Sequence, residues 1–344
     1  EVVELLKAKR VAPSELLDAS FASSEAVEPD VNAMPTVCKD RAYAAADALT
    51  HDNRDAMLVG LPFAIKDLTE VEGVRTTMGT VGLADNIPNK SDPLVQRLEG
   101  RGGIVVGKTN SPEFGAGGNT FNDVFGRTRN PWDVSKNAGG SSGGAAVSLA
   151  TGEVWLSHGS DLAGSVRTPA AYCGIVGMRP SPGRAGGGPG PMGFHTEGVQ
   201  GPMARSVLDC ALFMDAMSGF DPRSPISYPA PPQAFFDTTL RPAKAFRIGY
   251  SATLNGFGTI TPQIDNILRG ALNVVASNGA HVEDHCPDLT GLDETYRVLR
   301  AMLWAALPGR APDFITKNFK ATLQANIDYG RNLSIDDVYD TQLN

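Results

Sequence analysis

The sequence predicts an α/β fold with a mixed central β-sheet flanked by helices on both faces. Short apolar or alternating segments are typical of strands, and they occur at residues 58–68, 104–108, 246–250 and 281–285. Longer segments with an apolar face are typical of helices, and they occur at residues 92–100, 207–218, 261–278 and 289–307. Strands that alternate with helices indicate a sheet covered on both faces.

The N-terminal region, residues 1–57, is predicted to be mainly helical. Residues 1–10 carry apolar side chains on one side, and residues 12–27 open with a proline in the first turn, where proline is tolerated. Residues 39–49 are rich in alanine and predict a third helix. We expect these helices to pack around the core and to carry no chemistry.

The first predicted strand places a lysine in apolar surroundings. Val59, Leu61, Phe63 and Ile65 alternate along residues 58–68, so Lys66 lies inside or at the end of a buried strand. An ordinary lysine there would reach solvent or pair with a carboxylate such as that of neighbouring Asp67. Desolvation favours the neutral amine, and a neutral amine can act as a base near pH 7.

Residues 102–109 match the phosphate-binding pattern GxxxxGK[ST], but their composition does not suit a phosphate loop. Ile104, Val105 and Val106 are strand formers, and the segment before them predicts a helix where a phosphate loop requires a strand. We predict a buried strand ending at Lys108 and a loop at residues 109–118. A nucleotide-binding protein remains the remote alternative.

Two glycine-rich turns that contain serine dominate the middle of the chain. The first is GGSSGG at residues 139–144, and the second is GSDLAGS at residues 159–165. The apolar segment between them, residues 145–156, predicts a buried helix followed by a short strand. Glycine is usually kept where the backbone needs positive φ or approaches another group closely. The N–H groups of such turns can donate to a developing oxyanion, which points to acyl transfer.

These motifs resemble the amidase signature family of serine hydrolases, over residues 60 to about 222. The match rests on GLPFAIKD at residues 60–67, GGSSGG at residues 139–144, and GSDLAGSVRTPA at residues 159–170, in that order. The resemblance implies that Ser165 is the nucleophile, that Ser141 bridges the two other groups, and that Lys66 is the general base. It also implies a cis peptide bond between Gly140 and Ser141, and an acyl-Ser165 intermediate formed without a metal or an organic cofactor.

The resemblance assigns further roles around this triad. Backbone N–H groups are expected to form an oxyanion hole at Leu162, Ala163, Gly164 and Ser165. Supporting roles fall to Ser142, Asp161 and Arg167: Asp161 is expected to accept turn N–H groups, and Arg167 to hold a strand through a buried pair. Substrate contacts are expected from the loop residues Phe114, Gly115, Ala116, Gly117 and Gly118.

The chain departs from the usual family pattern in two respects. The second motif is more often GTDTGGS, whereas this chain has Ser160, Leu162 and Ala163. The donors are backbone groups, so the chemistry should survive while the pocket is reshaped. The usual C-terminal strands and helix are also missing, so we expect one amidase domain whose residues 58–222 form the catalytic core. Residues 223–344 are then its second part, either truncated or lacking segments.

After the second turn, residues 171–178 predict another core element and residues 179–193 a Gly/Pro-rich loop. Residues 201–206 are expected to open the helix at residues 207–218, with Ser206 as its cap. Residues 220–242 are rich in proline and irregular.

A Ser-His-Asp hydrolase is a further alternative, because residues 139–143 also fit GxSxG. That motif must follow a strand, but residues 130–137 are rich in turn formers, and none of the candidate bases His158, His195, His281 and His285 has a distinguishing context. Within the family, hydrolysis of carbamates, esters or cyclic amides and the glutaminase subunit of a tRNA amidotransferase remain open. If the protein is not an enzyme, the alternative is a binding module without catalytic activity.

The composition and the net charge of the chain limit the kinds of molecule that it is expected to bind. The 344 residues are 42% apolar and 20% charged, as in ordinary globular proteins with a sizeable core. A net charge of −8 disfavours nucleic acid and anionic membrane surfaces, and no apolar run has transmembrane length. Four scattered cysteines indicate reduced thiols in a cytoplasmic protein, and no metal site. The predicted partner is a small-molecule amide, and a homodimer is left open.

Overall fold

The computed structural model describes residues 1–49, 56–188, 192–241 and 246–343. The parts of the predicted regions that fall on residues 50–55, 189–191, 242–245 and 344 lie outside the described residues. The strands are β1 (Thr36–Val37), β2 (Pro62–Lys66), β3 (Ile104–Thr109), β4 (Phe121–Asn122), β5 (Gly126–Arg127), β6 (Leu156–Asp161), β7 (Val176–Gly177), β8 (Val199–Ala204), β9 (Arg247–Tyr250) and β10 (His281–Asp284). The helices are α1 (Val2–Lys7), α2 (Pro13–Val31), α3 (Lys39–Asp47), α4 (Pro93–Gly100), α5 (Gly143–Ala150), α6 (Arg167–Cys173), α7 (Val207–Met217), α8 (Phe235–Thr239), α9 (Pro262–Ser277), α10 (Leu292–Ala306), α11 (Asp313–Thr316), α12 (Ala321–Arg331) and α13 (Ile335–Leu343).

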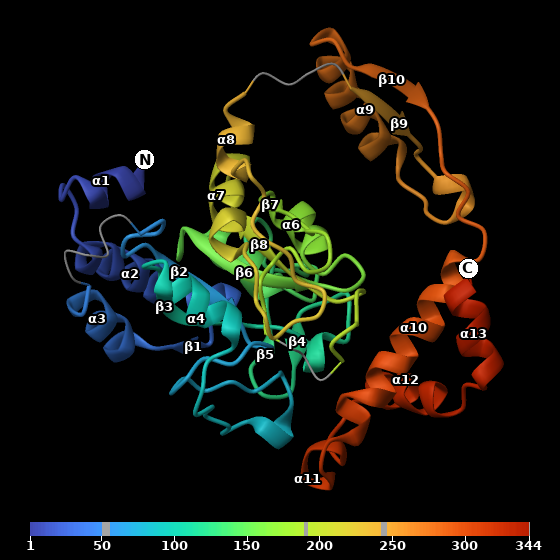
Figure 1. Cartoon of the computed structure of the whole chain (residues 1–344), viewed down its shortest axis with the longest axis horizontal. Helices are drawn as coiled ribbons and strands as arrows, with labels where there is room; N and C mark the ends of the chain where they lie inside the picture. Colours follow the sequence, from blue (N-terminus) through green and yellow to red (C-terminus); the bar gives the residue numbers. More distant parts are fainter. Residues whose placement is uncertain (50–55, 189–191, 242–245, 344) are drawn as a thin grey trace.

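Six strands form the central sheet, in the order β1-β3-β2-β6-β8-β7 (Figure 1). The middle strand β2 runs parallel to β3 and β6. The outer pairs β1–β3, β6–β8 and β7–β8 are antiparallel. The sheet is therefore mixed, as predicted.

Helices cover both faces of this sheet, which confirms the predicted class. Alternate side chains of β2 enter two different cores, because successive residues of a strand face opposite sides. Phe63 and Ile65 pack in one core with residues of α4 and α7. Ala64 packs in the other core with residues of α2, α3 and α5. Burying Phe63 completely contributes about 1.5–3 kcal/mol relative to leaving it exposed.

Strand β8 was not predicted. We expected residues 201–206 only to open the following helix, but β8 pairs along its whole length with β6. Gly201 and Pro202 disfavour strand structure locally, so the burial supplied by β6 decides the conformation. The helix itself begins at Val207, and the Ser206 hydroxyl accepts a hydrogen bond from Asp209 N–H at 3.1 Å, which confirms the predicted cap.

The predicted strands near residues 246–250 and 281–285 exist, but they do not join the central sheet. β9 and β10 pair with each other in parallel, and α9 connects them. This unit lies apart from the central sheet (Figure 1). Hydrophobic periodicity predicts a strand without specifying its partner, and here the nearest parallel partner lies one helix further along the chain.

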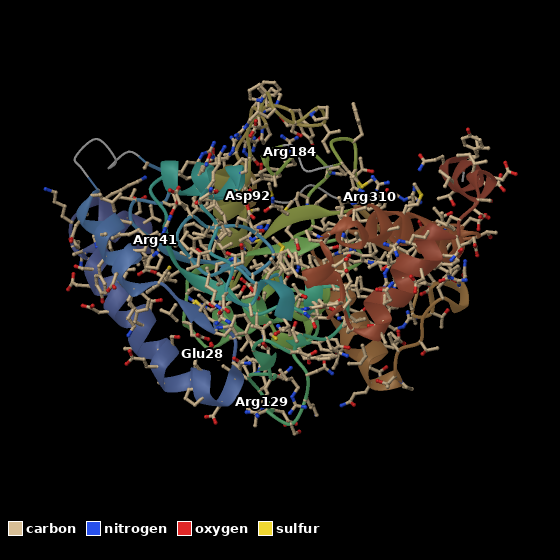
Figure 2. The ribbon with its side chains drawn as sticks, turned by 90° about the horizontal axis from the view of Figure 1, so that it is seen from below. Glu28, Arg41, Asp92, Arg129, Arg184 and Arg310 are labelled. Atoms are coloured by element: carbon tan, nitrogen blue, oxygen red, sulfur yellow. The ribbon has the colours of Figure 1, made fainter. Side chains whose placement is uncertain are left out.

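The C-terminal helices lie on the side of the molecule opposite to α2 and α3 in both views (Figures 1 and 2). Trp304 of α10 packs with Leu323 and Ile327 of α12 against Ala116. Phe114 lies in the same small core, where its ring meets that of Phe319 edge-on at 5.4 Å. This core attaches α10 and α12 to the loop that follows β3. None of the described helices is both long and apolar enough to span a bilayer.

Candidate active site

Lys66 is the last residue of β2, and its side chain is fully buried. Its amine donates hydrogen bonds to the hydroxyl oxygens of Ser141 at 2.7 Å, Ser142 at 2.8 Å and Ser160 at 3.0 Å. Burial lowers the pKa of the Lys66 amine to about 7, and the negative charge of Asp161 opposes this shift in part. The amine is therefore available in its neutral form near pH 7.

The first glycine-rich turn brings Ser141 to this amine. The peptide bond between Gly140 and Ser141 is cis. Thr120 fastens the turn, because its hydroxyl donates to Gly139 C=O at 2.9 Å and accepts from Gly143 N–H at 3.0 Å. A Cβ atom on Gly144 would lie only 2.4 Å from the carbonyl oxygen of Ala33, so the helix that follows can dock here only with glycine.

The second turn is shorter than predicted. Residues 159–161 form the end of β6, because they pair with residues 199–201 of β8, and only residues 162–165 turn. Glycine and serine have low strand propensity, so the sequence favoured a turn here. The strand places Ser160 beside Lys66, a contact that we did not predict.

Asp161 organises the second turn. Its buried carboxylate accepts from the N–H groups of Gly164 at 2.8 Å and Val166 at 3.1 Å. It also pairs with Arg167 at 3.0 Å and Arg179 at 3.1 Å. Burial alone would raise the pKa of Asp161, but the hydrogen bonds from Arg167 and the two N–H groups outweigh it and lower the pKa well below its usual range.

The expectation for Arg167 is met in part. Its guanidinium pairs with Asp161 at the end of β6, as expected of a residue that holds this strand, but Arg167 begins helix α6 and its side chain is 54% exposed, so only the Asp161 side of the pair is buried. Arg179, which lies in a segment predicted to be a loop, is the less exposed partner at 24%. A single sequence gives no signal for this second contact.

The predicted oxyanion donors divide into two groups. Gly164 N–H already donates to the Asp161 carboxylate, so it is not free for a substrate oxygen, contrary to our expectation. The N–H groups of Leu162, Ala163 and Ser165 have no acceptor among the residues that the structure describes.

Ser165 and Ser141 line the same pocket. The carbonyl oxygen of Ser165 accepts from Ser142 N–H at 3.0 Å, which fixes the backbone of one turn to the other. Within the described chain, the Ser165 hydroxyl has no hydrogen-bond partner. The structure thus shows the contact between Lys66 and Ser141 directly and leaves the hydroxyl of Ser165 free.

The pocket has a volume of about 550 Å³. The five predicted loop residues, from Phe114 to Gly118, all line it. Helix α10 and its C-cap form another wall that sequence reasoning missed, through Tyr296, Arg300, Leu303 and Trp304 of the helix and Leu307 at the cap. The apolar face of this helix was visible in the sequence, but not the place where it docks. Within the described ranges, no cluster of three or more His, Cys, Asp or Glu residues could hold a metal ion.

The structure argues against the two other readings of the motifs. Residues 104–109 are a strand, and Lys108 is buried beside Asp67 at 3.2 Å and Thr76 at 2.7 Å, so no phosphate loop exists here. His158 contacts Gln200 at 2.6 Å, and burial lowers its pKa to about 3, which makes it a poor base. His195 does line the pocket, but its Nε2 accepts from Gly198 N–H at 3.1 Å and its Nδ1 pairs with Glu197.

Comparison with known proteins agrees with this geometry. The family model described as Amidase matches residues 15–331, and the chain therefore belongs to this family, the amidase signature family. An acylamidase from Rhodococcus erythropolis is 34% identical over 91% of the chain and 65% of its own length. A glutamyl-tRNA(Gln) amidotransferase subunit from Anaeromyxobacter dehalogenans (strain 2CP-C) is 37% identical over 80% of the chain and 57% of its own length.

Among solved structures, a bacterial aryl acylamidase of the amidase signature family superimposes with a TM-score of 0.90 and 30% identity. The alignment covers 100% of this chain and 74% of that structure. The chain thus spans 57–65% of the length of the two curated relatives and three quarters of the solved one.

Proposed function

We propose that this chain hydrolyses a carboxylic amide through an acyl-Ser165 intermediate, with Ser141 and Lys66 as its proton relay. The observation that carries the proposal is the fully buried amine of Lys66, which lies 2.7 Å from the Ser141 hydroxyl at a pocket that Ser165 also lines. A buried amine with a pKa near 7 is a suitable base, because a serine hydroxyl is a weak nucleophile until its proton is removed.

In the acylation step, Ser165 Oγ attacks the amide carbon while its proton passes to Ser141 Oγ. Ser141 in turn gives its own proton to the neutral amine of Lys66. The relay requires Ser165 Oγ to reach Ser141, and no other partner among the described residues holds this hydroxyl back. Lys66 then returns the proton through Ser141 to the amide nitrogen, so the C–N bond breaks and a neutral amine leaves.

The tetrahedral intermediate places negative charge on the former carbonyl oxygen. We assign its stabilisation to the N–H groups of Leu162, Ala163 and Ser165, which are without acceptors among the described residues. One such donor commonly contributes about 3 kcal/mol to the transition state. The carboxylate of Asp161 supports these donors by fixing the turn through Gly164 and Val166.

In the deacylation step, water attacks the ester carbon of acyl-Ser165. The water proton follows the same route through Ser141 to Lys66, and it then returns to Ser165 Oγ as the C–O bond breaks. Carboxylic acid leaves, and all groups regain their starting protonation. Phe114 and residues 115–118 are proposed to contact the substrate, since they line the pocket.

A glutaminase component of an amidotransferase is the second candidate, favoured by the 37% identity with the amidotransferase relative described above. Such a protein would use glutamine and deliver ammonia to a partner complex. Carbamates, esters and cyclic amides share the same acyl chemistry. Cytoplasmic location and a homodimer stay predictions.

The proposal is tested with a fluorophosphonate probe, which labels activated serine. We expect one adduct per chain on wild-type protein, none on Ser165→Ala, and unchanged labelling on Ser206→Ala, which alters an exposed helix cap. Mass spectrometry with a panel of aryl amides, alkyl amides and glutamine then identifies the acyl group. Equal labelling of the Ser165→Ala variant would refute the assigned nucleophile.

A further inference from the structure

One wall of the pocket carries a guanidinium group that the proposed catalytic steps do not use. Arg300 of α10 lines the pocket and has no ion pair or hydrogen bond within the described chain. Arg297, one turn earlier on the same helix, pairs with Asp293 at 2.6 Å and points its charge to solvent at 55% exposure. The two arginines therefore differ: one is neutralised at the surface, and the other is unpaired in the pocket.

The surroundings of Arg300 hold it in place without neutralising it. Its guanidinium lies 5.9 Å from the ring centre of Tyr296, within the range of a cation–π contact. The nearby cation Lys320 is already engaged, because its amine donates to Ala116 C=O at 2.5 Å. Burial, together with the charge of Arg300, lowers the pKa of Lys320, although Glu113 and Asp123 oppose this shift.

The acidic residues that line the pocket are committed elsewhere. Asp161 is paired with Arg167 and Arg179. Asp92 caps α4 by accepting Leu94 N–H at 2.8 Å. Neither forms an ion pair with Arg300, so the positive charge at the α10 wall has no counterpart in the described protein. An unpaired guanidinium in a concave site is suited to a planar carboxylate, which it can bind through two parallel hydrogen bonds.

A second donor lies on the same face of α10, one turn further. Trp304 is 8% exposed and lines the pocket, and its indole N–H has no acceptor in the described part of the chain. A buried polar group without a partner is unusual in a folded protein. The wall thus presents the unpaired guanidinium of Arg300 to a pocket of about 550 Å³ that suits a ligand of moderate size, while the indole N–H of Trp304 is itself buried.

We propose that Arg300 forms a carboxylate subsite, so that the preferred substrates are amides that carry a carboxylate away from the scissile bond. This proposal rests on the proposed amidase function and deepens it. Because Arg300 acts on a remote group, its loss should affect substrates with a carboxylate and spare neutral substrates of the same length. The carboxylate would bind before reaction, so the effect should fall mainly on KM.

The test compares two p-nitroanilides, one with a free terminal carboxylate (glutaryl) and one neutral analogue of equal length (pentanoyl). For Arg300→Met, we expect kcat/KM for the glutaryl compound to fall at least tenfold through KM, with the neutral compound within twofold of wild type. Arg300→Lys should recover part of the loss, and Arg297→Met should change neither. Turnover of the neutral anilide reports that each variant is folded.

The outcomes separate the two proposals. If wild type hydrolyses neutral anilides and Arg300→Met affects both compounds equally, or neither, the carboxylate subsite is refuted and the amidase function stands. If no amide is hydrolysed, the carboxylate subsite is tested separately by measuring the binding of glutarate to wild type and to each variant by calorimetry. Binding lost in Arg300→Met and retained in Arg297→Met supports the subsite without the reaction, and binding unaffected by Arg300→Met, or absent from wild type, refutes the subsite.

Discussion

The amine of Lys66 lies 2.7 Å from the hydroxyl oxygen of Ser141, although 75 residues separate the two along the chain. Parallel strands explain how they meet. β2 and β6 run side by side in the same direction, so their carboxyl ends lie at one edge of the sheet. Lys66 ends β2 there, Ser160 approaches from β6, and Ser141 comes from the turn before α5.

Activity should depend on the protonation of Lys66. The base must be neutral, and its pKa is about 7, so kcat/KM should fall as the pH drops below 7 and level off above it. Lys66→Met should lose at least roughly 100-fold in kcat/KM, since general-base catalysis commonly contributes that much. A pH–rate profile between pH 5 and 9 measures the first effect. Lys7→Met, which alters a lysine of the surface helix α1, is the control. Full turnover by Lys66→Met would contradict the assigned role.

Asp161 should matter for both activity and stability. In Asp161→Asn the side chain can still accept one turn N–H, but it no longer neutralises Arg167 and Arg179. We expect a loss of about 1–3 kcal/mol in the free energy of unfolding, because a buried acceptor is removed while both arginines can reach water. The misplaced turn should also lower kcat/KM. Arg167→Gln should have a smaller effect on both, since Arg179 remains. Urea denaturation and steady-state kinetics check this, and equal losses in the two variants would count against Asp161 as the organiser.

The sequence was informative where a local pattern determines the structure. The alternation before Lys66 predicts a buried strand, and the glycines around Ser141 predict a tight turn, so both chemical groups could be located in advance. It was uninformative where packing overrides local preference, as at Gly201 and Pro202 of β8.

Contacts between segments that lie far apart in the sequence could not be predicted either. The apolar face of α10 is visible in the sequence, but only the fold shows that Trp304 packs on Ala116 and thereby brings Arg300 to the pocket. Likewise, Asp67 was considered as a partner for its neighbour Lys66. Asp67 is the first residue after β2, and the structure pairs it with Lys108 of the adjacent strand, while Lys66 contacts Ser141 instead.

The buried pair of Lys108 and Asp67 should show strong energetic coupling. Both side chains are at most 1% exposed, and their charged atoms lie 3.2 Å apart. Burial lowers the pKa of Lys108, and the carboxylate of Asp67 opposes this shift. Lys108→Met leaves a buried carboxylate without its cation, which commonly costs about 3–5 kcal/mol. The double variant Lys108→Met/Asp67→Asn should lose clearly less than the sum of the two single variants. Urea denaturation of the four proteins gives the coupling energy, and additive losses would show that the pair is not coupled.

Glu153 should make the stability of the fold depend on pH. It lies after α5 and is completely buried, and its carboxyl group accepts from Thr151 Oγ1 at 2.8 Å. Burial and the neighbouring negative charge of Glu28 raise its pKa from 4.5 to about 8. The folded state therefore holds a proton that the unfolded chain releases above about pH 4.5. Its contribution to stability is fully present below that pH, and it is lost as the pH rises through about 8.

Glu153 should therefore lower the stability of the wild-type chain progressively between pH 5 and 8, while the lowered pKa values of buried Lys66 and His158 act in the opposite direction. Glu153→Gln keeps the shape of the side chain and removes its titration, so the difference in Tm between this variant and wild type should grow as the pH rises and should reach a few degrees in favour of the variant at pH 8. Glu25→Gln, at an exposed position of the same helix as Glu28, should leave the slope unchanged. A Glu153→Gln variant with the wild-type slope would place the proton on another group. Glu28→Gln distinguishes the two carboxyl groups, because removing the neighbouring charge should lower the pKa of Glu153 and flatten the slope only in part.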